Sequence, residues 1–122
     1  GAGNGKSGDG SNSGSSGKTA TEVRTAVSAS IASEVRPFLR SCAPSGVGVS
    51  DLRLFVQLSL TRSGALTSAS VYDVQGENAT NQSQVEPMKK CAIDALNKAS
   101  PFNLDSADYD VWKSHRVQLK PN

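Results

Sequence analysis

The chain has few of the residues from which metal, nucleic-acid and membrane sites are built. Its 122 residues include one histidine and two cysteines, and no apolar run approaches the length of a transmembrane helix. One His and two distant Cys fall short of the four closely spaced ligands of a structural zinc site. The net charge of +2 is small and the Lys and Arg residues are dispersed, which argues against nucleic acid as a partner. We therefore expect no metal, no cofactor and no nucleic acid.

Residues 1–18 lack the apolar side chains that a folded core requires. They contain seven Gly and five Ser, and Ala2 is their single apolar residue. Burial of so little apolar surface cannot offset the entropy lost when a backbone becomes ordered. We therefore expect a flexible, dispensable linker over residues 1–18 and one folded domain over residues 19–122.

An amphipathic helix is predicted over residues 19 to about 39. Thr19 and Glu22 have the spacing of a capping box at its start, and Pro37 weakens its last turn. Its apolar positions share one face at helical spacing, namely Val23, Val27, Ile31, Val35 and Phe38. This stripe has to be covered by another element.

A β-hairpin is predicted after a loop that contains Gly and Pro. Residues 52–60 alternate strictly, with every second side chain apolar, and form the clearest strand in the sequence. The turn is predicted at residues 62–65, and residues 66–74 alternate more weakly as the returning strand. The more apolar first strand is expected at the centre of a sheet.

A second helix and a third strand complete the pattern. Ser83 and Glu86 have capping-box spacing, Pro87 falls in the first turn, and Ser100-Pro101 ends the helix. After a connection that holds three aromatic residues, residues 115–120 alternate as a half-buried strand. The order helix, hairpin, helix, strand predicts an α+β fold in two layers. A three-stranded antiparallel sheet packs against two main helices, with the closing strand at one edge.

The last third of the chain also resembles a known family. Its blocks Lys98-Ala99-Ser100-Pro101-Phe102 and Tyr109-Asp110-Val111-Trp112-Lys113, followed by an alternating strand that ends in Lys-Pro, are similar to the C-terminal periplasmic domain of TolA, most of all to its alphaproteobacterial forms. With less specificity, the resemblance extends over roughly residues 20–121. It implies a periplasmic protein-binding domain of the Tol–Pal system. The parent protein would be anchored in the inner membrane, with its anchor and long helical middle segment ahead of residues 1–18.

The resemblance implies proteins as partners. In that family the domain links the inner membrane to the outer envelope by binding TolB, and filamentous phage coat proteins and some colicins also use it. The implied partners are TolB, then Pal, and a phage coat protein or a colicin translocation domain. An exported domain with two cysteines also favours one disulfide, Cys42 to Cys91, which would join the two helices. The alternative, two buried thiols in a cytosolic protein, stays open.

An edge strand is the expected binding element, because main-chain hydrogen bonds provide affinity without requiring a particular side-chain sequence. The candidate is residues 114–120, whose Lys and Arg side chains discourage self-pairing and attract an acidic partner. Tyr109 and Trp112 border it as apolar anchors, although Trp112 is equally consistent with a core role. The predicted partner-binding residues are Tyr109, Trp112, Lys113, Ser114, His115, Arg116, Val117, Gln118, Leu119 and Lys120.

Other functions leave signatures that this sequence lacks. A TonB-type energy transducer resembles this domain in fold and also binds by strand addition, but it would carry a Tyr-Pro signature. A secreted cystatin-like inhibitor would carry a Gln-x-Val-x-Gly hairpin, whereas the turn here is Arg62-Ser63-Gly64. Cys91 and His115 are of the nucleophile and base types, but Cys91 has a Cys partner and a lone His on a strand is usually structural. No catalytic residue is predicted, and the two non-enzymatic alternatives stay open.

Overall fold

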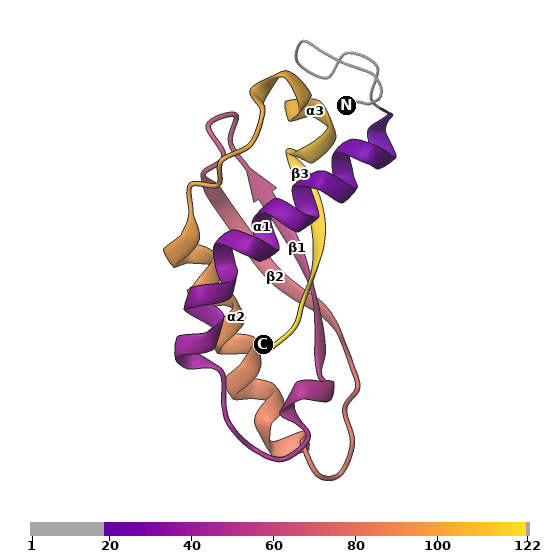
Figure 1. Ribbon diagram of the computed structural model, residues 1–122, viewed down its shortest axis with the longest axis vertical. Coiled ribbons are helices and arrows are strands. Elements are labelled where there is room, and N and C mark those ends of the chain that lie inside the picture. Colours follow the sequence, from indigo (N-terminus) through magenta and orange to yellow (C-terminus); the bar gives the residue numbers. More distant parts are fainter. Residues whose placement is uncertain (1–18, 122) are drawn as a thin grey trace.

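The computed structural model describes residues 19–121 as a three-stranded sheet with two long helices on one of its faces (Figure 1). The elements are α1 (Ala20–Cys42), β1 (Arg53–Leu60), β2 (Leu66–Gln75), α2 (Val85–Ala99), α3 (Tyr109–Trp112) and β3 (Ser114–Leu119). The predicted α+β class and element order are confirmed, and the short α3 is an addition. The expected linker over residues 1–18 lies outside the described residues.

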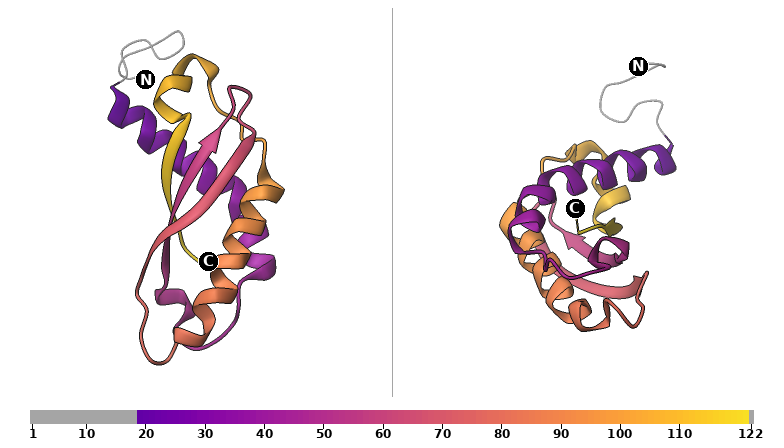
Figure 2. Two further views of the ribbon diagram at one scale, coloured as in Figure 1. Left: turned by 180° about the vertical axis from the view of Figure 1, so that it is seen from behind. Right: turned by 60° about the horizontal axis from the view of Figure 1, so that its bottom comes forward.

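The sheet has the order β2-β1-β3, with every pair antiparallel, so β1 is central and β3 lies at an edge as predicted. β1 turns one face toward the helices, where its side chains are buried, and the other face is only partly covered. Figure 2 shows from behind that no helix crosses this second face of the sheet. The fold therefore has two layers, and its core lies between the sheet and the helices. No helix within residues 19–121 is long and apolar enough to span a membrane.

The first helix begins as the sequence predicts. Thr19 caps α1, with its side chain accepting a hydrogen bond from the Glu22 amide while the Glu22 side chain accepts one from the Thr19 amide. The helix continues past Pro37 to Cys42, three residues beyond the predicted end. The buried residues of α1 recur strictly every four positions. The expected last member, Phe38, is only half-buried, and Leu39 is buried in its place. The buried members are Val23, Val27, Ile31, Val35 and Leu39.

The start of α2 differs from the expectation. The helix begins at Val85 after a 3₁₀ turn (Gln82–Gln84), and no side chain caps it, so the predicted capping box of Ser83 and Glu86 is wrong. The chain is held here instead by Asn81, which is fully buried. Its amide donates to the carbonyls of Gly48 and Gly76, and its Oδ1 accepts from the Asn78 amide. The loop after β2, which contains Gly76, Asn78 and Asn81 itself, is thereby joined to the loop before β1 through one side chain.

The two helices are linked covalently. Cys42, at the end of α1, forms a disulfide with Cys91 in α2, and their Cα atoms are 5.5 Å apart. The predicted pairing is therefore confirmed. The bond closes a covalent ring that contains a 3₁₀ turn (Val49–Asp51), the β1–β2 hairpin and the first part of α2, so it joins the end of α1 directly to the interior of α2.

Loss of the disulfide should lower the free energy of unfolding. The cysteines are 49 residues apart, and opening a loop of this size should cost about 2–4 kcal/mol because the unfolded chain gains conformational freedom. Equilibrium urea unfolding of a Cys42→Ser, Cys91→Ala double variant measures the change. Reduction of the unsubstituted protein should give a similar loss, and unchanged urea midpoints in both experiments would contradict the prediction.

Truncation of Asn81 should also destabilise the domain. The Asn81→Ala variant loses three side-chain hydrogen bonds at a buried site and leaves carbonyl groups unpaired, so we expect a loss of about 3 kcal/mol. Thermal and urea unfolding provide the measurement. The control is Asn97→Ala on the exposed side of α2, which should change stability little. Equal effects of the two substitutions would rule out this role for Asn81.

Candidate functional site

β3 presents a row of unpaired backbone groups at the edge of the sheet. In an antiparallel ladder, hydrogen-bonded residue pairs alternate with non-hydrogen-bonded pairs. The bond from the Leu60 amide to the Lys113 carbonyl, 2.9 Å long, sets this alternation for β1 and β3. His115, Val117 and Leu119 therefore direct their N–H and C=O groups toward β1. The residues whose backbone groups point away from the sheet are Ser114, Arg116 and Gln118.

Side chains of β3 alternate in the same way. His115, Val117 and Leu119 are buried beneath the helices, whereas Ser114, Arg116, Gln118 and Lys120 are exposed. The structure thus divides the predicted binding residues between two roles. The buried ones hold β3 to the core, and the exposed ones are free to meet a partner. Lys113, just before the strand, is exposed and pairs with Asp110 at 3.6 Å.

The aromatic residues beside β3 belong to the packing of the connection. Trp112 has no exposed surface, and its indole N–H donates to the Asp105 carbonyl at 2.9 Å. Its prediction as a partner anchor is therefore wrong, because a fully buried ring cannot contact a partner. Tyr109 is half-buried, donates its hydroxyl to the Leu60 carbonyl, and meets the Trp112 ring edge-on. Its phenol thus ties α3 to the end of β1.

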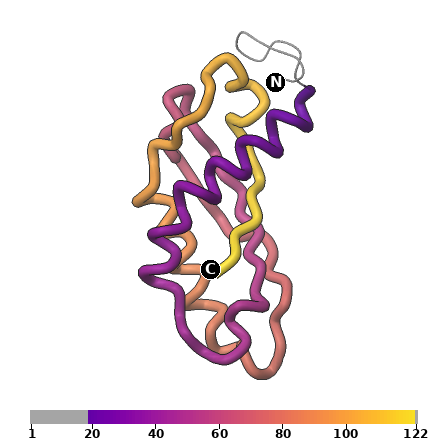
Figure 3. Tube along the Cα trace, in the orientation of Figure 1, coloured from indigo at the N-terminus to yellow at the C-terminus, as the bar shows by residue number. Residues whose placement is uncertain are grey.

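Two hollows lie along the boundary between α1 and β3, and together we call them the α1–β3 groove. α1 crosses over β3 in the chain trace (Figure 3). The first hollow, of about 470 Å³, is lined by Arg24, Thr25, Ser28, Gln57, Ser114, His115 and Arg116. The second, of about 230 Å³, is lined by Ala32, Arg36, Leu39, Gln118, Leu119 and Lys120. Residue numbers rise together on both sides, so α1 and β3 run in the same general direction.

The groove is basic. None of the described residues that line either hollow is acidic, and the cations among them are Arg24, Arg36, Arg116 and Lys120. Arg116 is held in place, because its Nε donates to Gln57 and its guanidinium lies 4.8 Å from the Tyr72 ring centroid. The other three cations are exposed and form no ion pair within residues 19–121. Their charges remain available to an acidic ligand.

Sequence reasoning found the β3 side of the groove and missed the α1 side. Arg24, Ser28, Ala32 and Arg36 each follow a member of the buried stripe by one position, so they form a second row at the boundary of the packed face. The four-residue spacing is a signal that could have placed them together. The sequence did not show that this row lies beside β3.

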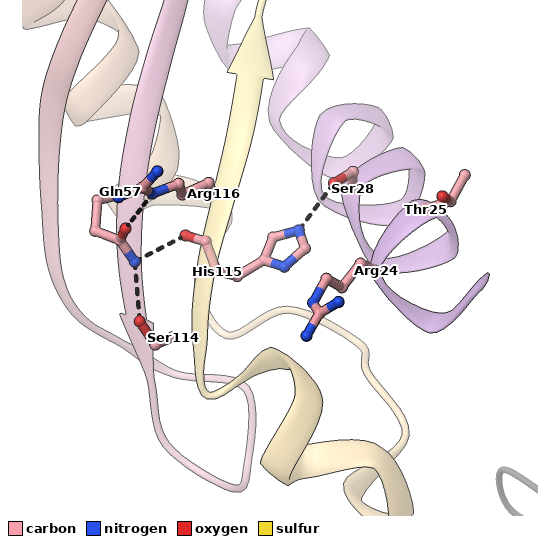
Figure 4. Close-up of a pocket in the computed structure, with 7 residues that line it drawn as sticks. All are labelled: Arg24, Thr25, Ser28, Gln57, Ser114, His115 and Arg116. Atoms are coloured by element: carbon pink, nitrogen blue, oxygen red, sulfur yellow. Dashed lines mark hydrogen bonds between the residues drawn. The ribbon is translucent and has the colours of Figure 1, made fainter. Parts of the chain in front are cut away.

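His115 connects the two sides of the groove. It is 4% exposed, and its Nε2 lies 2.8 Å from the Ser28 hydroxyl (Figure 4). Burial, and secondly the charge of Arg24, lower the pKa of His115 below 6.5, so the imidazole is neutral at pH 7. The sulfur of Cys91 is bonded to Cys42, which removes the nucleophile from the Cys91 and His115 alternative. The imidazole therefore acts in packing and hydrogen bonding.

The lowered pKa of His115 predicts a loss of stability in acid. The unfolded chain binds this proton more tightly than the folded one, so the free energy of unfolding should fall as the pH drops below 6.5 toward the folded-state pKa. Urea unfolding between about pH 7 and pH 5 tests this, since His is the side chain that ordinarily titrates there. A His115→Leu variant should have a flatter profile, whereas Ser28→Ala should keep the slope. Parallel profiles for all three proteins would contradict the assignment.

Comparisons of this chain with family models, curated proteins and solved structures returned no match. The geometry and charge of the α1–β3 groove, together with the sequence, are therefore the basis for a functional proposal.

Proposed function

We propose that this domain binds proteins by accepting an extended segment of a partner as a fourth strand beside β3. The observation that carries the proposal is the row of outward backbone groups on Ser114, Arg116 and Gln118, which lies along the α1–β3 groove. An extended peptide can pair with such groups through its own main chain. The groove provides space beside the edge, and α1 provides side chains that contact the added strand.

The opposite edge is less suited to this role. The pairing of β1 with β2 contains two register irregularities, which locally disrupt the ladder and increase its twist. The register of β1 with β3 is regular from Leu54 and Leu119 to Ser59 and Ser114. A regular edge repeats its outward donors and acceptors at every second residue without interruption, so β3 is the edge on which a straight peptide fits.

The resemblance to TolA supplies the biological setting of the proposal. We assign the domain to the periplasm, with a parent protein anchored in the inner membrane and TolB or Pal as the partner at the outer membrane. Support comes from the sequence blocks around Phe102 and Trp112, the helix-hairpin-helix-strand order, and a disulfide of the kind that persists in oxidising compartments. The same edge would serve a filamentous phage coat protein or a colicin segment, and this binding requires no catalytic residue.

A proline at an outward position of β3 should block strand addition without disturbing the sheet. The Gln118 amide points away from β1, so Gln118→Pro removes a donor that the folded domain does not use internally. A peptide from the TolB N-terminus should bind the variant at least about tenfold more weakly, because a main-chain bond is lost and the ring obstructs the edge. Titration calorimetry gives the affinity, and amide chemical shifts locate the peptide.

Gln118→Ala is the matched control, because it removes the same side chain and keeps the N–H group. Its affinity should stay close to that of the unsubstituted protein. Val117 is unsuitable for the proline test, since its amide faces β1 and its side chain is buried. Strand addition at β3 would be excluded if Gln118→Pro and Gln118→Ala bound the peptide equally, or if the shifts avoided residues 110–120.

A further inference from the structure

A small hollow lies between the first half of α1 and the connection that leads from α2 to β3 (Figure 1). Successive residues of a helix are about 100° apart, so its α1 residues lie on the side of the helix opposite Arg24, Thr25 and Ser28, which line the α1–β3 groove. We call this separate site the α1–connection hollow. Its volume is about 110 Å³, and it is lined by Val23, Ala26, Val27, Ser30, Asn103, Leu104, Asp105, Asp108 and Trp112.

Asp108 brings to this hollow a buried carboxylate for which residues 19–121 provide no partner. It is 8% exposed, and its side chain forms no hydrogen bond or ion pair within those residues. Asp108 also occupies the N-cap position of α3, where an Asp side chain ordinarily accepts a bond from a backbone amide of the first turn, yet this bond is not formed. A buried charge without a partner raises the free energy of the folded state, so the carboxylate is suited to a cation that enters the hollow.

A second carboxylate lines the hollow, and no described cation does. The exposed Asp105 side chain accepts a bond from the Ala107 amide at 2.9 Å, which holds its turn in place. Arg62 contacts this turn from outside the hollow, since its Nη1 donates to the Ser106 carbonyl and its guanidinium lies 4.7 Å from the Tyr109 ring centroid. The lining of the hollow is therefore acidic.

The walls of the hollow are apolar. Val23, Val27 and Trp112 are buried, and Leu104 is half-buried. An alkyl chain can lie along such walls while its charged end meets a carboxylate. The volume equals roughly four waters at about 30 Å³ each, which accommodates an ammonium group and the methylenes next to it. A guanidinium group has five N–H donors in a fixed plane, and several of them would face the valines unpaired.

The size of the hollow also limits the source of the ammonium group. Sites that enclose a whole small molecule usually measure about 300–1,000 Å³, well above this volume. The rim is exposed at Ala26, Ser30 and Asn103, so the backbone of a bound chain can lie across it while one side chain enters. The dimensions therefore fit the end of a protein side chain.

We infer that the α1–connection hollow binds the side-chain ammonium group of a lysine from a partner protein. The Asp108 carboxylate accepts a charge-assisted hydrogen bond from it, and the methylenes contact Val27 and Leu104. Ser30 and Asn103 provide polar groups at the rim. This contact lies apart from β3 and does not depend on strand addition, so it gives the domain a second docking point with the opposite charge preference.

The test titrates three capped Ala-X-Ala peptides into the whole chain, where X is Lys, Nε-acetyl-Lys or Arg. Amide shifts of residues 103–108 and the indole N–H shift of Trp112 report binding. The Lys peptide should bind with a Kd on the order of 1–10 mM. The other two should bind at least about tenfold more weakly, because acetylation removes the charge and the guanidinium leaves donors unpaired. Equal binding of the acetylated peptide, or tighter binding of the Arg peptide, would overturn the inference.

Removal of the buried charge tests the role of Asp108. Asp108→Asn should weaken the Lys peptide at least about tenfold. Its urea midpoint should stay the same or rise, because the carboxylate has no internal partner. Asp110→Asn is the matched control, since it makes the same charge change on α3 at a side chain that is 88% exposed and paired with Lys113. Equal affinity losses in the two variants, or a lower urea midpoint for Asp108→Asn, would contradict the assignment.

A change at the rim provides a second test that leaves Asp108 in place. Ala26→Met adds a long side chain at the exposed rim and should weaken the Lys peptide about tenfold by narrowing the entrance. Ala29→Met makes the same change at an exposed position of α1 that does not line this hollow, so the affinity should stay unchanged. Indistinguishable affinities of the two variants would place the peptide elsewhere.

Three further outcomes would overturn the inference. If n-butylammonium shifts the amides of residues 103–108 and the Lys peptide does not, the occupant is a free amine. If Mg²⁺ shifts them at lower concentrations than the peptide, the hollow binds a metal ion. If no probe shifts them, it holds water alone. Strand addition at β3 is reported separately by the amides of residues 114–118, so either proposal can fail while the other stands.

Discussion

Burial of one face of β1 beneath α1 and α2 is the constraint on which the rest of the structure depends. The side chains of Leu54, Val56, Leu58 and Leu60 all enter this layer, so β1 has to occupy the centre of the sheet. Both of its backbone edges are then used, by β2 and β3, and each of those strands has a free outer edge. The free edge at β3 is a geometric consequence of a three-stranded sheet that is covered on one face.

The same burial determines which groups of β3 are free. A shift of one residue in register would bring the exposed Arg116 and Gln118 into the core and expel Val117 and Leu119, at a large loss of apolar burial. The register is therefore fixed, and with it the direction of every N–H and C=O group along the strand. Folding uses one alternate set of residues in this six-residue segment, and the proposed strand addition would use the other set. The outer edge of β3 is therefore held in place by the core residues between the outward-facing ones.

The helices and strands could be predicted from the sequence because each has one buried face, on which apolar residues recur at a regular interval. The alternation of residues 52–60 gave the central strand, and the four-residue stripe gave α1. Contacts between distant segments could not be predicted. Nothing local marks Asn81 as buried, since its side chain is enclosed by a contact with the carbonyl of the distant Gly48. The indole of Trp112 becomes a core group only because the preceding loop folds back over it. The α1 side of the groove depends on how α1 crosses β3, which periodicity does not encode.

Opposite charges lie beside the two free edges, and this limits how copies of the chain can pair. The hollow between β2 and α2 is lined by Asp73, Glu77 and Glu86, with Lys89 paired to Glu86 at 3.1 Å, whereas the α1–β3 groove is basic. Symmetric pairing through either edge would place like charges opposite one another, which is unfavourable. Pairing of a β2 edge with a β3 edge is opposed by the irregular ladder of β2. The cations that protect β3 from its own copies are thus the groups that make it attractive to an acidic segment.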